Sequence, residues 1–397
     1  MKIAHIVRRF TFSEWGGTES VVWHIARQQK AQGLTPEILC TSALDKAGTE
    51  VVEGVTIRRF SYFYPYFPMP GKDRLALDKK GGNPFSPGLM KCLKSGDYDI
   101  FHIHAGSRLA NCAMKLGKKL GTPCIMSLHG GSCAIPEQEM ALMLKPLQHK
   151  FSCGGIIDRL CNLRKVPESQ ADLLLALSKE EVQKLQSRFP GKRVELFPNG
   201  ILHRELPGEG NFREKYNIPA GKRVVLCISR IDYQKNQKIL LEVLKAREDT
   251  HLLLIGPVTA AWYLDEVQSE AEKFQLRDRL TVIPGLAPDS QELLQALKCA
   301  YCFILPSRHE PFGIAALEAL DGGVPLIASA VGGLKDFLVD GRNALLFEDN
   351  NKESLLESFK KLEACRTALI EGGKATAAAY NWQSISARLS DIYRELL

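Results

Sequence analysis

Two glutamates and two basic residues in the second half of the chain have the types and the spacing to bind an anionic sugar donor. Glu310 and Glu318 are separated by seven residues in PSRHEPFGIAALEAL, and Arg230 and Lys235 both lie in CISRIDYQKNQ. Two neighbouring cations can neutralise a diphosphate leaving group, which gains negative charge as its bond to a sugar breaks. A carboxylate can accept hydrogen bonds from a ribose. Either cation alone would be an ordinary surface residue.

The residues after Pro311 predict a largely apolar helix, beginning near Phe312 or Gly313 and ending at Gly322-Gly323. Glu318 within such a helix is costly to bury unless it has a partner, and a ribose diol would supply one. The amides of residues 312–314 would form an anion site at the helix start, with Glu310 just before them. The alternatives are a helix-dipole interaction for Glu310 and a narrow solvated face for Glu318.

Glycines and histidines are the candidates in the first half. Gly16 and Gly17, in RRFTFSEWGGTES, allow a ligand to approach the backbone near a helix start. Glu19 falls in the first turn of that helix, where it could also simply favour the dipole. His129 follows the strand CIMSL, and His104 ends the neighbouring strand. No carboxylate or cysteine completes a metal site with these histidines, so no metal is predicted.

Short apolar runs alternate with amphipathic stretches along the whole chain, which is typical of α/β proteins with parallel sheets covered by helices. A polar, Gly/Pro-containing break follows Pro198-Asn199-Gly200. We therefore expect two doubly wound domains, residues 1–200 and 201–378, with a cleft between them for small ligands. The expected strands are Lys2–Val7, Glu37–Thr41, Val55–Arg59, Ile100–His104, Cys124–Leu128, Leu173–Leu177, Val224–Ser229, Leu252–Ile255, Leu280–Ile283, Cys302–Leu305 and Leu326–Ser329.

Ligands of such sheets bind beyond the carboxyl ends of the strands. This rule selects a small set of residues rich in glycine, histidine and charge: 8–17, 104–106, 129–131, Arg230, Gly256, Gly285-Leu286, 307–310 and 331–333.

Composition and charge suggest the compartment and the partners. The chain starts without the pattern of a signal peptide, no apolar stretch approaches about 20 residues, and the 11 cysteines lie mostly in apolar segments. A cytoplasmic protein is expected. Residues 1–200 hold 28 Lys+Arg and 18 Asp+Glu, against 24 and 27 in the remainder. The first half could therefore meet an anionic membrane or a phosphorylated acceptor, or the bias could only improve solubility.

Taken in order, these pieces resemble the retaining glycosyltransferases of the GT-B fold, specifically family four, over nearly the whole chain. The motifs that carry the resemblance are GGTE at residues 16–19, DIFHIH, SLHG, LSKEE, PNGI, SRIDYQKN, EPFGIAALEA and VGGLKDFLVDGRNALLF. The resemblance implies two Rossmann-like domains that face each other across a cleft. It also implies that a final segment, residues 379–397, forms a helix that crosses back to the first domain.

The resemblance also implies roles for individual residues. Arg230 and Lys235 would bind the donor diphosphate and Glu318 the ribose, while the donor sugar and phosphate would be held by Glu310, Phe312, Gly313, Ile314 and Ala315. Leu286 would lie on the donor side. His129 would lie beside the transferred sugar, Gly16 and Gly17 near phosphate and acceptor, and Glu19 and His104 on the acceptor side. Configuration would be retained without a divalent metal or other cofactor.

Three positions depart from the pattern of the family. Asn236 stands where glycine is common, Asp321 where small residues are common, and Asn343-Ala344 where Asn-Gly is common.

The acceptor is the less determined substrate. Residues 60–90 are aromatic, Pro/Gly-rich and basic, and residues 132–168 form another basic excursion. Both are expected to shape the acceptor site and to touch a membrane that bears a lipid-linked sugar; packing of the aromatics over the domain edge is the alternative. The expected partners are a nucleotide sugar and a carbohydrate or lipid-linked acceptor of polysaccharide, lipopolysaccharide or glycolipid assembly, and not nucleic acid.

Other functions of the same architecture remain open at this point: a sugar-nucleotide epimerase, a phosphorylase, or a non-catalytic protein that binds sugar nucleotides. A nicotinamide dehydrogenase is disfavoured because the loop after the first strand is not G-x-G-x-x-G.

Overall fold

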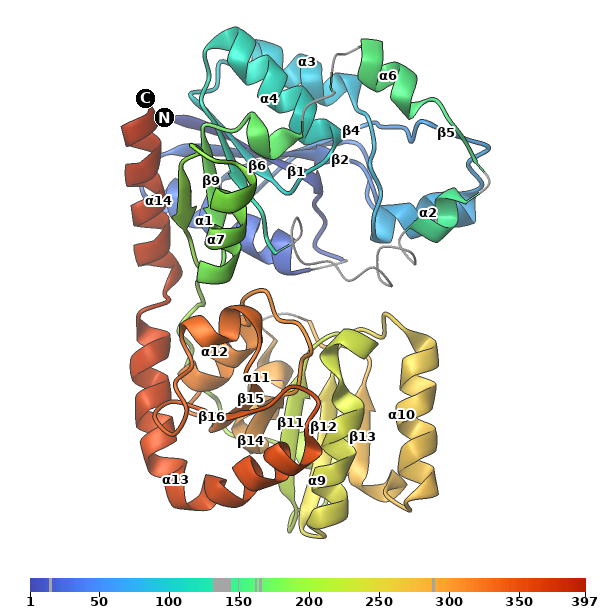
Figure 1. Ribbon diagram of the computed structural model, residues 1–397, viewed down its shortest axis with the longest axis vertical. Helices are drawn as coiled ribbons and strands as arrows, with labels where there is room; N and C mark the ends of the chain where they lie inside the picture. Colours follow the sequence, from blue (N-terminus) through green and yellow to red (C-terminus); the bar gives the residue numbers. More distant parts are fainter. Residues whose placement is uncertain (14–15, 131–143, 149, 161–162, 164–165, 288–289) are drawn as a thin grey trace. The chain divides into compact units, whose positions relative to one another are not determined.

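The computed structural model contains two large β-sheets, one in each half of the chain, and helices flank each of them (Figure 1). The structure describes residues 1–397 except 14–15, 131–143, 149, 161–162, 164–165 and 288–289. Unit 1 comprises residues 1–199 and 382–397, and unit 2 comprises residues 200–381. The α/β prediction with two Rossmann-like sheets is therefore confirmed.

The sheet of unit 1 has the strand order β10-β9-β7-β6-β1-β2-β4-β3. Only the β3–β4 pair among these strands is antiparallel. The strands are β1 (Lys2–Arg9), β2 (Thr35–Thr41), β3 (Gly48–Val52), β4 (Val55–Phe60), β6 (Ile100–His104), β7 (Cys124–Ser127), β9 (Leu173–Ala176) and β10 (Val194–Leu196). A separate antiparallel pair joins β5 (Tyr66–Phe67) and β8 (Phe151–Ser152).

Helices connect these strands and cover the sheet. They are α1 (Gly17–Ala31), α2 (Gly71–Lys79), α3 (Pro87–Ser95), α4 (Arg108–Leu120), α6 (Gly154–Leu160), α7 (Lys179–Arg188) and α14 (Trp382–Leu396), with short 3-10 helices η1 (Lys145–Leu147) and η2 (Pro167–Ser169).

Alternate residues of a strand face opposite sides of the sheet. Ala4, Ile6, Phe101 and Ile103 of β1 and β6 belong to the apolar cluster that includes residues of α3 and α4. The residues between them point to the opposite side, where α1 and α14 pack. Histidines occupy this second face, and α1 and α14 supply their polar partners.

The last helix, α14, docks on α1. Its buried apolar side chains recur at helical spacing from Trp382 to Tyr393, so they form one continuous stripe. The rings of Trp382 and His24 stack with centroids 5.6 Å apart, and the Ser390 hydroxyl donates to Gln32 at 2.6 Å. These contacts place the C-terminal helix within unit 1.

Unit 2 is a parallel six-stranded sheet with the order β13-β12-β11-β14-β15-β16. Its strands are β11 (Arg223–Ile228), β12 (Thr250–Ile255), β13 (Leu280–Ile283), β14 (Ala300–Leu305), β15 (Leu326–Ser329) and β16 (Leu345–Phe347). Its helices are α8 (Phe212–Lys215), α9 (Leu241–Ala246), α10 (Ala261–Lys273), α11 (Gln291–Cys299), α12 (Ile314–Asp321) and α13 (Lys352–Ala378), with η3 (Tyr233–Lys235), η4 (Gln237–Leu240), η5 (Arg277–Arg279) and η6 (Gly332–Asp336).

The expected strands are all present, with ends that differ by at most two residues. The helix expected from Phe312 or Gly313 instead begins at Ile314. Gly313 has a φ of +101°, a left-handed value that excludes it from the helix.

Candidate functional site

The loops that follow four neighbouring strands of unit 2 are joined to one another by backbone hydrogen bonds. These bonds run from Ile231 N to the oxygen of Pro257 (2.9 Å), from Arg308 N to Gln234 (2.8 Å) and from Gly333 N to Glu310 (2.9 Å). The loops after β11, β12, β14 and β15 thus form one connected edge at the carboxyl end of the sheet, where ligands of this class of fold bind.

Lys235 and Glu310 meet at this edge. Lys235 Nζ lies 2.6 Å from Glu310 Oε2, and both side chains are about nine-tenths buried, with relative exposures of 12% and 11%. The Ser307 hydroxyl donates to the same carboxylate oxygen at 3.3 Å. The structure therefore brings together two of the predicted site residues that are 75 positions apart in the sequence.

Arg230 lies on the same edge and is more exposed. Its guanidinium is 3.1 Å from Asp232 Oδ2 and donates to Gln234 Oε1 at 3.2 Å. Asp232 also accepts from the Thr259 hydroxyl at 3.0 Å and from the Lys235 amide at 3.2 Å. Asp232 thus links the loop after β11, which carries both cations, to the loop after β12, and its position directly after Arg230 and Ile231 was the only sequence signal for this role.

Close backbone packing shapes the edge around Glu310. A Cβ on Gly332, which has a φ of +49°, would lie 2.2 Å from the carbonyl oxygen of Glu310, and a Cβ on Gly333 would lie 2.2 Å from that of Pro311. Glycine is therefore required at both positions for the loop after β15 to pack against the loop after β14.

Helix α12 presents its N-terminus beside Glu310. The amides of residues 312–315 make no backbone hydrogen bond within the described part of the chain, as expected for the first residues of a helix. Glu318 is half-buried rather than fully buried. Its side of α12 is therefore partly exposed, which is compatible with the alternative of a narrow solvated face. Leu286 is also half-buried, in the loop after β13.

The side chain of Glu19 lies against the N-terminus of α1 in unit 1. Its carboxylate lies 3.2 Å from Arg9 Nε, and a Cβ on Gly16 would lie 2.7 Å from it, whereas nothing would meet one on Gly17. Glu19 is buried. The structure therefore gives Glu19 a local electrostatic role at a helix start. Among the residues selected from the sequence, 14–15 and Gly131 lie outside the described residues, as does part of the basic excursion at 132–168.

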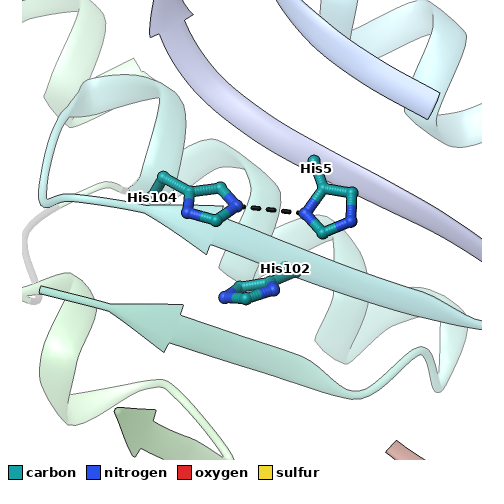
Figure 2. A group of neighbouring side chains, drawn as sticks. All are labelled: His5, His102 and His104. Carbon is teal, nitrogen blue, oxygen red and sulfur yellow. Dashed lines mark hydrogen bonds between the residues drawn. The ribbon is translucent and has the colours of Figure 1, made fainter. Parts of the chain in front are cut away.

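A row of histidines lies on the face of the unit 1 sheet that contacts α1 and α14; Figure 2 shows three of them, His5, His102 and His104. His5 of β1 is hydrogen-bonded to His104 of β6 (3.1 Å), and His104 to His129 (2.9 Å). Burial lowers the pKa of His5 and of His129 to about 4 and that of His104 well below its usual value. His129, with a φ of +50°, ends the row at the carboxyl end of β7. These imidazoles are neutral at physiological pH.

His5 was missed by sequence reasoning, although it is opposite His102 in the β1–β6 register. His5, His102 and His104 have nitrogens within 4.8 Å of one another. However, hydrogen bonds already occupy these nitrogens: His102 is bonded to Tyr393 (2.6 Å) and Ser127 (2.8 Å). A metal would have to displace several of these bonds, so the group fits a hydrogen-bonded network better than a metal site.

The three departures from the family pattern have local explanations. Asn236 has a φ of +52°, a left-handed value that glycine and asparagine adopt most easily. Asp321 accepts from His203 at 2.6 Å and from the Arg204 amide at 3.1 Å. Asn343 is buried and is hydrogen-bonded to Val339, Phe337 and Thr376.

Among the described residues, no helix combines the length and the apolar character that crossing a bilayer requires.

Comparison with known proteins covers both halves of the chain. The family model described as Glycosyl transferases group 1 matches residues 209–381, and that described as Glycosyltransferase Family 4 matches residues 15–202.

Relatives and solved structures agree with these matches. D-inositol 3-phosphate glycosyltransferase of Streptosporangium roseum is 31% identical over 410 residues, which cover 95% of this chain and 88% of the relative. GDP-mannose:cellobiosyl-diphosphopolyprenol alpha-mannosyltransferase of Xanthomonas campestris is 25% identical over 419 residues, covering 100% and 97%. The structure of Anabaena HepE with UDP-glucose matches with a TM-score of 0.72 and 17% identity, covering 100% of each chain.

Proposed function

Because the chain belongs to the group 1 glycosyl transferases of family 4, we propose that the connected edge of unit 2 binds its nucleoside diphosphate sugar through Lys235, Arg230 and Glu310. The enzyme is a retaining glycosyltransferase of the GT-B fold that takes a sugar from a nucleotide sugar. The observation that carries the proposal is the buried pair of Lys235 and Glu310. Lys235 Nζ and Glu310 Oε2 lie 2.6 Å apart at the edge of the sheet where four strands end.

In this proposal each group meets one part of the donor. Arg230 and Lys235 neutralise the diphosphate, whose charge grows as the glycosidic bond breaks, so no divalent metal is needed. Glu318 accepts from the ribose hydroxyls. Glu310 and the amides of residues 312–315 bind the sugar and the adjoining phosphate. Gly16, Gly17 and Leu286 also line the donor, and His129 contacts the transferred sugar.

A donor screen tests the proposal. Thermal shift with UDP-glucose, GDP-mannose and related nucleotide sugars should identify a stabilising donor, and calorimetry should then compare Lys235→Ala with wild type. Loss of a charge-assisted hydrogen bond predicts a roughly 10- to 100-fold weaker affinity.

Lys238→Ala is the matched control. Lys238 lies only three residues from Lys235 in the sequence, and its substitution removes an exposed ion pair with Glu266. This variant should keep the wild-type affinity. An unchanged donor affinity in Lys235→Ala would contradict the proposed site, and conversion of the donor to an isomer without an acceptor would favour an epimerase.

We further propose that the acceptor is a lipid-linked saccharide in bacterial-type polysaccharide, lipopolysaccharide or glycolipid assembly. The names of the relatives support an anionic acceptor: one is named for inositol 3-phosphate and another for a diphosphopolyprenol. In unit 1, Phe67 and Phe151 face each other across the β5–β8 pair and are 73% and 69% exposed. Exposed aromatics on a unit rich in lysine and arginine are typical of proteins that bind anionic membranes peripherally.

Vesicle flotation tests the membrane contact. At low salt, wild type should float with vesicles that contain anionic lipid, while Phe67→Ser/Phe151→Ser should float markedly less. The control variant Val51→Ser removes an apolar side chain that is 66% exposed on β3 and should behave as wild type. Equal flotation of all three proteins, or none with wild type, would refute the membrane contact.

A further inference from the structure

A continuous chain of hydrogen bonds, buried as far as His104 and part-buried at its last bond, leads from Gln29 on α1 to His129 at the end of β7. Gln29 Oε1 lies 2.7 Å from His5 Nε2, His5 Nδ1 lies 3.1 Å from His104 Nε2, and His104 Nδ1 lies 2.9 Å from His129 Nε2. Figure 2 shows the His5 and His104 rings with the bond between them. Because each imidazole uses one nitrogen on either side, the direction of donation at one end fixes it at the other.

The two contacts of the Gln29 amide fix that direction. One terminal atom of the amide lies 2.7 Å from His5 Nε2, and the other terminal atom lies 3.3 Å from the Tyr393 hydroxyl oxygen. The distance to His5 suits an imidazole N–H that donates to the amide oxygen, and it is short for a bond between two nitrogens. The distance to Tyr393 suits an amide N–H that donates to the hydroxyl, and it is long for a hydroxyl that donates to the amide oxygen. The amide oxygen therefore faces His5, and the amide nitrogen faces Tyr393.

The protons then follow in order. His5 donates to Gln29 through Nε2–H, so its Nδ1 must accept from His104 Nε2–H. His104 Nδ1 must in turn accept from His129 Nε2–H. Each ring carries a single proton because burial keeps the pKa values of all three low. His129 is left with an unprotonated Nδ1, which makes no hydrogen bond to any described residue.

The other branch of the network is satisfied in the same way. Tyr393 accepts from Gln29 and donates to His102 Nδ1 at 2.6 Å, and His102 Nε2–H donates to Ser127 at 2.8 Å. Each hydrogen bond of the two branches therefore has one donor and one acceptor. One amide thus sets the tautomers of four histidines.

We infer that Gln29 is a positioning residue that holds His129 as a neutral hydrogen-bond acceptor, so that its position in the site takes a sugar hydroxyl and rejects a carboxylate. The inference rests on the proposed function for the contact between His129 and the sugar. A bare nitrogen accepts from a hydroxyl, whereas a carboxylate has no proton to give and would face a lone pair. The donor is accordingly a nucleoside diphosphate of a neutral sugar rather than of a uronic acid.

Nitrogen-15 NMR of the histidine rings tests the tautomer without any substrate. In wild type, His129 should show the shifts of the Nε2–H tautomer, and its signals are assigned by their loss in His129→Asn, since asparagine tolerates the left-handed backbone there. Gln29→Met removes the amide oxygen, so the ring signals of His129 should shift towards a mixture of tautomers. Gln32→Met instead breaks the bond from the residue that caps the end of α1 to Ser390 of α14 and should leave the ring signals unchanged.

A Nδ1–H tautomer of His129 in wild type would overturn the inference, whether or not Lys235 binds the donor. An unaltered Nε2–H signal in Gln29→Met would do the same. Addition of Zn²⁺ to wild type should leave the ring signals in place; if it moves those of His5, His102 and His104 together, the cluster is a metal site.

Kinetics test the specificity. The ratio of kcat/KM for UDP-glucose over UDP-glucuronate, or for GDP-mannose over GDP-mannuronate, should be roughly 100 or more in wild type. Gln29→Met should lower this ratio about tenfold, while Gln32→Met should keep it. Equal use of both sugars by wild type would refute the specificity, and a loss of stability in Gln29→Met with an unchanged ratio would leave Gln29 a purely structural role.

Discussion

Lys235 and Glu310 neutralise each other in the absence of donor. A buried lysine without a partner would pay a large desolvation cost, and removal of either partner from such a pair typically costs about 3–5 kcal/mol. An ammonium carries three donors, and Glu310 accepts from only one of them. Lys235 can thus remain paired with Glu310 while it binds an anionic group, so the pair need not be broken when a diphosphate arrives.

The histidines of unit 1 are stabilised by hydrogen bonds rather than by an ion pair. His5, His102 and His104 are buried, and polar groups on both sides satisfy their ring nitrogens. A buried polar network stabilises a fold only if all its members are satisfied. Burial lowers the pKa values of these three rings, and a second proton on any of them would also face another donor.

The loop after β15 is the element that holds the loop of Glu310 in place. Gly332→Ala should therefore do more harm than an ordinary glycine substitution. It introduces a Cβ 2.2 Å from the carbonyl oxygen of Glu310 at a φ of +49°, so the backbone must move. We expect a loss of more than about 1–2 kcal/mol in the free energy of unfolding, the usual cost of a left-handed alanine, together with weaker donor binding.

Gly341→Ala is the matched control for this substitution. Gly341 has a φ of +71° and open space around its Cβ position, so the variant pays the backbone cost alone and should bind the donor as wild type does. Urea denaturation and donor calorimetry measure both quantities. If the two variants lose the same stability and bind the donor equally well, the packing between the loops does not support the site.

The elements that the sequence predicts best are those with a uniform environment. Every residue of β12 is buried, so its apolar run is visible in the sequence. The missed strands lack this signal: β3 is almost wholly exposed at the antiparallel edge of its sheet, and β10 and β16 have three residues each. Polarity and shortness hide a strand because pairing with a neighbour, rather than burial, defines it.

For the site, residue type and position after a strand selected Lys235, Glu310 and His129 from the sequence. Their partners could not be selected in the same way. The contact between Lys235 and Glu310 depends on how two distant loops pack, and Gln29 belongs to a helix surface that shows no functional pattern. His5 lies inside the apolar run IAHIV, where a single polar residue indicates a buried hydrogen bond only once the facing strand is known.

For the whole molecule, the two units should respond differently to acid. Burial lowers the pKa of His5, His102, His104 and His129 in unit 1. Unit 2 has His251, with a pKa lowered to about 4 by burial, and exposed His203, whose pKa is raised by its hydrogen bond to Asp321. The first kind of group opposes folding in acid, whereas His203 favours it.

The sign follows from proton binding. A histidine with a pKa of about 4 in the folded state and about 6.5 in the unfolded state binds more protons when unfolded, so its contribution to stability is present above pH 6.5 and is lost as the pH falls towards 4. Between pH 7 and 5 this amounts to about 2 kcal/mol for each such group. Unit 1 should therefore lose several kcal/mol, and unit 2 much less.

Hydrogen exchange followed by mass spectrometry can resolve the two units in one experiment. After correction for the intrinsic effect of pH on exchange, peptides from β6 should lose more protection between pH 7 and 5 than peptides from β12. His251→Asn should flatten the pH dependence of β12 without changing that of β6, because the two strands belong to separate compact units. An equal loss of protection in β6 and β12 would mean that the buried histidines of unit 1 do not govern its stability in acid.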